Sequence, residues 1–143
     1  MTLYLPDVNV VVASVRADHP HHDDARNFLQ SAKSRSDAFV VPVEVLASSM
    51  RILMLDIWVD PESSASASAL MRSWVDAADA EIVGHPAGSF TVLNELARTL
   101  DLSPRRVPDA LLASSAIVLR ATLVSFDRGF AGYPGLSAVV LSS

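Results

Sequence analysis

The first ten residues, Met1-Thr-Leu-Tyr-Leu-Pro-Asp-Val-Asn-Val10, change from a strand pattern to a helix pattern around one aspartate. The apolar run of residues 3–5 favours a strand, and Pro6 fits only at its end because proline has no N–H for a sheet. Apolar residues then recur at the spacing of a helix face, at Val8, Val11, Val12 and Val15. Asp7 is therefore expected at the carboxyl end of a strand, where open α/β sheets bind their ligands.

The same alternation of strand and helix patterns continues along the chain and predicts the fold class. Further strand-like runs are expected at residues 38–41, 80–83, 122–125 and, at an edge, 136–141. Helices are expected at residues 23–34, 43–55, 63–75, 89–100 and 110–119. This order predicts a three-layer α/β/α domain with a short, mostly parallel central sheet. Since no linker or repeat interrupts the pattern, residues 1–143 are expected to form a single domain.

Composition favours a cytoplasmic protein. The chain of 143 residues is long enough to bury a core and has no cysteine, so a disulfide framework is excluded and a reducing compartment is expected. The apolar stretch before Asp7 has no Lys or Arg ahead of it, which argues against a secretory signal. No uncharged apolar run approaches the roughly 18 residues of a membrane span, so no membrane partner is expected.

The net charge of −5 argues at first against a nucleic acid partner. If four carboxylates are gathered in one pocket to hold cations, however, the remaining surface is nearly neutral. Ten of the eleven basic residues are Arg, which binds phosphate oxygens with a planar fork, and the other is Lys33. The composition therefore permits a nucleic acid substrate without requiring one.

Four acidic residues share one structural description, because each lies near a predicted strand end or in the first turn of a helix. They are Asp7, Glu44, Asp109 and Asp127. In one crevice they would repel each other by about 4 kcal/mol per pair at roughly 4 Å, and a hard cation removes that repulsion. Mg²⁺ prefers oxygen ligands and is commonly held by a few carboxylates and a substrate phosphate. The pattern therefore predicts a metal site that acts on phosphate chemistry.

Other interpretations remain open for single residues. Asp7, Glu44 and Asp109 are also suitable residues for helix caps or first turns, and Asp127 before Arg-Gly suits a turn. The three histidines of residues 17–22 could suggest a metal site, but a solvated, proline-broken loop is the preferred interpretation.

Four motifs, in order and spacing, resemble those of PIN domains, and most closely those of VapC ribonuclease toxins of bacterial toxin–antitoxin pairs. They are Asp7-Val-Asn9 after a strand, Glu44 behind Val-Pro, Pro108-Asp-Ala-Leu-Leu-Ala-Ser114, and Val124-Ser-Phe-Asp-Arg-Gly-Phe130. The resemblance covers essentially the whole chain. It implies a PIN-like fold and a Mg²⁺-dependent (or Mn²⁺-dependent) endoribonuclease that acts as a toxin and hydrolyses RNA.

The resemblance also assigns roles to residues. Asp7, Glu44, Asp109 and Asp127 would be the metal-binding and catalytic acids, and Asn9 and Ser125 would support them. Candidates for contacts with RNA phosphates are Arg16, Arg98, Arg105, Arg106 and Arg128. It further implies a homodimer and a VapB-like antitoxin whose tail covers a groove beside the active site. A surplus of apolar residues near one helix end agrees with a further interface: Ile52, Leu53, Leu55, Trp58 and Val59.

Two rival functions compete with the nuclease. A metal-dependent phosphatase or phospho-acceptor domain is disfavoured, because the only lysine is Lys33 in a predicted helix and Asn9 stands where a dehalogenase-type phosphatase needs a second Asp. A non-catalytic PIN-like module that binds RNA or protein is disfavoured because all four acids are intact.

Overall fold

The computed structural model describes residues 1–141, in which five parallel strands form one central sheet. The strands are β1 (Leu3–Pro6), β2 (Ala38–Pro42), β3 (Glu81–Val83), β4 (Thr122–Ser125) and β5 (Ala138–Val140). Their spatial order is β3-β2-β1-β4-β5, and every neighbouring pair is parallel. The predicted parallel sheet is confirmed, with β5 at an edge.

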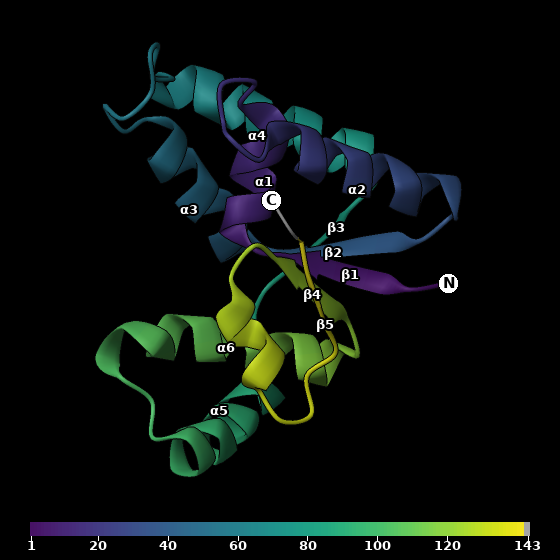
Figure 1. Cartoon of the computed structure of the whole chain (residues 1–143), viewed down its shortest axis with the longest axis vertical. Helices are drawn as coiled ribbons and strands as arrows, with labels where there is room; N and C mark the ends of the chain where they lie inside the picture. Colours follow the sequence, from purple (N-terminus) through teal and green to yellow (C-terminus); the bar gives the residue numbers. More distant parts are fainter. Residues whose placement is uncertain (142–143) are drawn as a thin grey trace.

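Helices cover both faces of the sheet, which confirms the three-layer α/β/α architecture (Figure 1). One layer holds α1 (Val8–Val15), α2 (His22–Ser34), α3 (Val43–Leu53) and α4 (Ser64–Ala78). The other layer holds α5 (Gly88–Leu100) and α6 (Val107–Leu119), with short 3₁₀ turns η1 (Pro104–Arg106) and η2 (Arg128–Gly132) beside it. In the described part of the chain, none of the helices has the length and apolar character needed to cross a membrane.

Several helix boundaries differ from the sequence prediction by one to three residues, and two of these differences bear on the site. The helix α6 begins at Val107 rather than at residue 110, because proline is tolerated in a first turn and Pro108 therefore does not delay the helix. The helix α3 ends at Leu53 rather than at residue 55. Leu53 itself is fully buried, so it does not contribute to an exposed apolar surface as the sequence suggested.

The central strand β1 determines where the site lies. From β1 the chain runs to β2 and β3 on one side, and it later returns to β4 on the other side. Pro6 pairs with Val124 of β4, and the backbone N–H of Asp7 donates to the Val124 carbonyl at 2.8 Å. Such a reversal of strand order is the place where open parallel sheets leave a crevice beyond the strand ends.

Candidate active site

Asp7 stands between β1 and α1, as the sequence predicted, and caps the helix. Its carboxylate accepts hydrogen bonds from the Val8 backbone N–H at 2.7 Å and from the Ser125 hydroxyl at 2.8 Å. Burial raises the pKa of Asp7, and the negative charges of Asp109 and Asp127 raise it further, against the lowering effect of both hydrogen bonds. The folded chain therefore holds this carboxylate in one orientation in a place that penalises its charge.

Ser125 and Asn9 connect Asp7 with the segment that carries Asp127 through hydrogen bonds. The Ser125 hydroxyl, which is fully buried, accepts a hydrogen bond from the Asp127 backbone N–H at 3.0 Å while it donates to Asp7. Asn9 donates to the same hydroxyl at 3.2 Å and accepts from the Phe126 backbone N–H at 3.2 Å. The structure thus places both predicted supporting residues in direct contact with each other and with the segment that carries Asp127.

Arg106 lies between two of the acids. Its Nη1 atom is 3.0 Å from a carboxylate oxygen of Asp109 and 3.0 Å from one of Asp127. Burial raises the pKa of Asp109 in spite of the nearby guanidinium. The pKa of Asp127 is lowered, chiefly because its carboxylate accepts a hydrogen bond from the Gly129 N–H and also because Arg106 is close. The guanidinium packs so closely over Gly129 that a Cβ at this position would collide with it. One cation of the chain therefore balances two of the predicted metal ligands.

Glu44 has a different partner from the other acids. Its carboxylate lies 2.9 Å from Nε2 of His85, and Nδ1 of the same ring lies 2.6 Å from the buried hydroxyl of Ser115. The Ser115 hydroxyl in turn contacts Ser89 at 3.1 Å. The Glu44 side chain is otherwise 70% exposed at the start of α3. His85 was not predicted from the sequence, although it follows β3 by two residues, as Asp127 follows β4.

The acids border two adjoining hollows rather than one crevice. Asp7, Asp109 and Asp127 line a hollow of about 360 Å³, whereas Glu44 lines a smaller one of about 160 Å³ together with Asp7, Asp109 and His85. Among residues 1–141, no three His, Cys, Asp or Glu side chains stand together as a metal-binding group. The structure therefore places the four acids around two hollows that share Asp7 and Asp109, with Arg106 paired to Asp109 and Asp127 and with His85 within hydrogen-bond distance of Glu44.

The chemistry of these residues nevertheless fits a hard divalent cation. Three carboxylates border the same hollow, and each lies close enough to affect the charge of another. Carboxylate oxygens are the ligands that Mg²⁺ and Mn²⁺ prefer. A cation in this hollow would offset the burial penalty and the weaker repulsion from Asp109 and Asp127 that raise the pKa of Asp7.

The five candidate arginines occupy different surroundings. Arg16 is only 9% exposed, and its guanidinium is used inside the chain by Asp18, Glu62 and the Asp60 carbonyl. Its assignment as a phosphate contact is therefore corrected, because its donors are already engaged. Arg98 is exposed and lies 3.5 Å from Glu95 on α5. Arg105 and Arg128 are exposed. Arg128 directly follows Asp127, and the charge of Arg105 acts on Asp109, whereas Arg106 is half-buried near both acids.

The histidine loop is more ordered than the sequence suggested. The His21 ring stacks on Phe126 with ring centres 4.6 Å apart, and the His19 ring lies 5.6 Å from that of His21. Nδ1 of His22 lies 2.7 Å from the Ala13 carbonyl oxygen. The preferred interpretation of a loop over a metal site therefore stands for the described residues, but the three rings are half-buried rather than fully solvated.

Comparison with known proteins gives consistent matches over nearly the whole chain. The PIN domain family model matches residues 4–136. Ribonuclease VapC25 of Mycobacterium tuberculosis is 33% identical over 133 residues, which cover 92% of this chain and 93% of that protein.

Solved structures with a similar fold include VapBC2 from Rickettsia felis bound to a promoter DNA fragment, with a TM-score of 0.75, 20% identity, and 99% and 100% of the two chains covered. A toxin–antitoxin complex from Klebsiella pneumoniae has a TM-score of 0.63 and 16% identity, with 98% and 97% covered.

Proposed function

The chain belongs to the PIN domain family, among its VapC members, and on that premise we propose that it is a metal-dependent endoribonuclease acting as the toxin of a toxin–antitoxin pair. One observation carries the proposal: Asp7, Asp109 and Asp127 border the same hollow at the carboxyl ends of β1 and β4. A fold gains nothing in stability from gathering like charges, so such a cluster points to a site that binds cations.

Asp7, Asp109 and Asp127 would hold one Mg²⁺ or Mn²⁺ ion, and Glu44 from the adjoining hollow would complete the set or serve a second ion. Such an ion, when bound, lowers the pKa of a coordinated water and shields the charge of a phosphodiester. The chain's own contribution is orientation. Ser125 and the Val8 N–H fix the Asp7 carboxylate, and the Gly129 N–H fixes one oxygen of Asp127 at 2.8 Å.

Arg106 is the cation best placed to meet a substrate phosphate. Its guanidinium already lies at the acids, and a planar fork binds phosphate oxygens through two parallel hydrogen bonds. Arg105 and Arg128 are exposed beside it, in η1 and η2. These three arginines would hold the RNA backbone, and Arg16 would not.

The proposed partners are a VapB-like antitoxin and a second copy of the chain. The match with a solved toxin–antitoxin complex supports the former. Apolar side chains exposed after α3 support an interface of the latter kind: Met54, Leu55, Ile57 and Val59. Light scattering of the purified chain should give the mass of a dimer, and a monomer at high micromolar concentration would contradict this part of the proposal.

The function is tested by incubating the purified protein with total cellular RNA, with Mg²⁺, with Mn²⁺ and with a chelator. Discrete RNA fragments that form only in the presence of a metal ion would support the endoribonuclease. Binding of RNA without cleavage under every condition would favour a non-catalytic PIN-like module instead. Release of phosphate from a phosphomonoester, with intact RNA, would favour the phosphatase.

A further inference from the structure

The hollow beside the acids has two chemically different walls. Polar side chains form one wall, from Asp7, Asn9, Asp109 and Asp127. Apolar and aromatic side chains form the other, from Val12, His19, Ile52, Ile57 and Trp58. A divalent cation and a phosphate would use only the polar wall. The apolar wall therefore has no role in the proposed metal chemistry, and we expect it to contact another part of the ligand.

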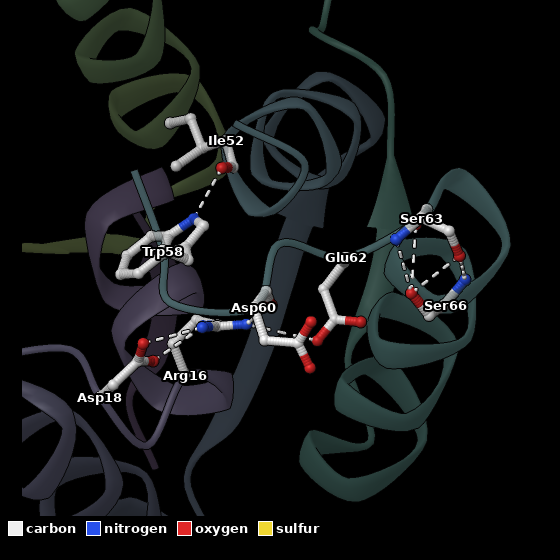
Figure 2. Close-up of polar contacts among 8 residues, drawn as sticks. All are labelled: Arg16, Asp18, Ile52, Trp58, Asp60, Glu62, Ser63 and Ser66. Atoms are coloured by element: carbon white, nitrogen blue, oxygen red, sulfur yellow. Dashed lines mark hydrogen bonds and ion pairs between the residues drawn. The ribbon is translucent and has the colours of Figure 1, made fainter. Parts of the chain in front are cut away.

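The aromatic wall is held in place by a dense set of contacts around Arg16 (Figure 2). The Trp58 indole N–H donates to the Ile52 carbonyl at 2.9 Å, and the Arg16 guanidinium lies 4.9 Å from the centre of the Trp58 ring. Arg16 also donates to the Asp60 carbonyl at 2.9 Å and to both carboxylate oxygens of Asp18 at 2.8 Å. The loop between α3 and α4 is thus fastened to the end of α1, which fixes Trp58 beside the acids.

Further rings connect this wall with the segment that carries Asp127. The Trp58 and His19 ring centres lie 5.9 Å apart, those of His19 and His21 lie 5.6 Å apart, and His21 stacks on Phe126. Phe126 directly precedes Asp127 in the chain. The four rings therefore form a series that runs from Trp58, in the loop between α3 and α4, to Phe126 beside Asp127.

We propose that Trp58 and His19 form a subsite for one unpaired base of the RNA substrate, next to the phosphate held at the acids. The proposal rests on the ribonuclease function given above. Every base has a flat π-face that stacks on aromatic side chains, and the hollow of about 360 Å³ is of the size of small ligand pockets. Paired bases in double-helical RNA are stacked inside the helix and cannot reach such a wall. The subsite therefore selects single-stranded or looped RNA.

The test compares variants of Trp58 on a short single-stranded RNA that the wild-type protein cleaves. Trp58→Ala should raise KM about tenfold, which corresponds to ~1.4 kcal/mol, with kcat changed much less. Trp58→Phe, which keeps an aromatic face, should recover most of this loss. Phe90→Ala is the matched control, because Phe90 is an aromatic residue that is 67% exposed on α5 and lies outside the lining of the hollow. Circular dichroism and Mn²⁺ titration check that the fold and the metal site persist.

A second arm identifies the base itself. In the same RNA, single nucleotides around the cleaved bond are replaced by abasic ones. At one position the abasic nucleotide should raise the wild-type KM about tenfold and should add nothing further in Trp58→Ala, because both changes remove the same contact. Additive effects at every position, or equal KM values for wild type and Trp58→Ala, would overturn the subsite while leaving the nuclease intact.

Other outcomes separate the alternatives. If Trp58→Ala leaves KM unchanged but shifts the mass measured by light scattering, the wall is a protein interface and the proposal is overturned. If the wild-type protein cleaves no RNA with either metal ion, the proposed function fails first, and the subsite fails with it.

Discussion

Arg106 and Asp127 form an ion pair at 3.0 Å although they are 21 positions apart in the chain, and the same nitrogen of Arg106 also reaches Asp109. The guanidinium thus neutralises two carboxylates that a divalent cation would otherwise neutralise. Arg106 is 24% exposed, so it is screened only in part by solvent. Arg106 and a metal ion therefore compete for the same carboxylate oxygens.

This competition predicts that Arg106→Gln binds Mn²⁺ more tightly than the wild type, by roughly 3- to 10-fold, since an ion pair of partial exposure contributes about 1 kcal/mol. Cleavage of RNA by the same variant should nevertheless fall, because a phosphate contact is lost. Isothermal titration with Mn²⁺ measures the first effect. Arg72→Gln is the control, because Arg72 is 66% exposed on α4, is not among the candidates for RNA contacts, and should change neither quantity. Weaker Mn²⁺ binding by Arg106→Gln would show that the arginine orients the acids instead.

The raised pKa of Asp7 predicts a specific effect on stability in the absence of metal ions. In the unfolded chain this carboxyl ionises near the ordinary aspartate pKa of 3.8, but burial makes ionisation harder in the folded chain. As pH rises from 3.8 through the folded pKa, the ionised group destabilises the fold progressively, and above that value the penalty is complete. Asp7→Asn, which retains an oxygen for the cap, should therefore melt at a higher temperature than wild type at neutral pH.

Thermal melts in a chelator, at several pH values, measure this effect. The advantage of Asp7→Asn should shrink as pH falls and disappear below the unfolded pKa. Saturating Mn²⁺ should reverse the order of the two proteins, because a ligand at about 100 times its Kd adds ~2.7 kcal/mol to the wild type alone. Equal melting temperatures at every pH, with and without Mn²⁺, would mean that Asp7 carries no buried charge.

The contact between Glu44 and His85 predicts that the two residues act as one unit. His85→Ala should weaken Mn²⁺ binding about as much as Glu44→Gln does, by a few-fold, because the freed carboxylate is 70% exposed and loses its fixed orientation. The double variant should be no weaker than Glu44→Gln alone. His85→Gln tests for rescue by a side chain that can still donate a hydrogen bond. Additive losses would mean that His85 acts independently of Glu44.

Much of this site could be predicted from the sequence because its framework is local. The change from strand to helix at Asp7, and the first-turn position of Asp109, follow from apolar periodicity and proline within about ten residues. The side-chain partners could not be predicted in this way. Arg16 resembles any surface arginine until the fold brings it to Asp60, 44 positions away, and Glu44 meets His85 across 41 positions.

The separation of Glu44 from Asp127 has the same origin. Sequence places each acid at a strand end or helix start, but the distance between them depends on how widely β2 and β4 are spaced, with β1 between them. Asp7 and Asp109 line both hollows, so they are shared, whereas Glu44 and Asp127 each line only one. The four acids are therefore not equivalent, and Asp7 and Asp109 are the two that the hollows share.

The most direct test of the central claim is the rate of Mg²⁺-dependent RNA cleavage by Asp7→Asn. Asparagine keeps the size of the side chain and its capacity to cap α1, so circular dichroism should show an intact fold. If Asp7 is a metal ligand, the rate should fall by about a thousandfold or more, even though the metal-free protein becomes more stable. A folded Asp7→Asn protein that cleaves RNA at nearly the wild-type rate would contradict the assignment of this site.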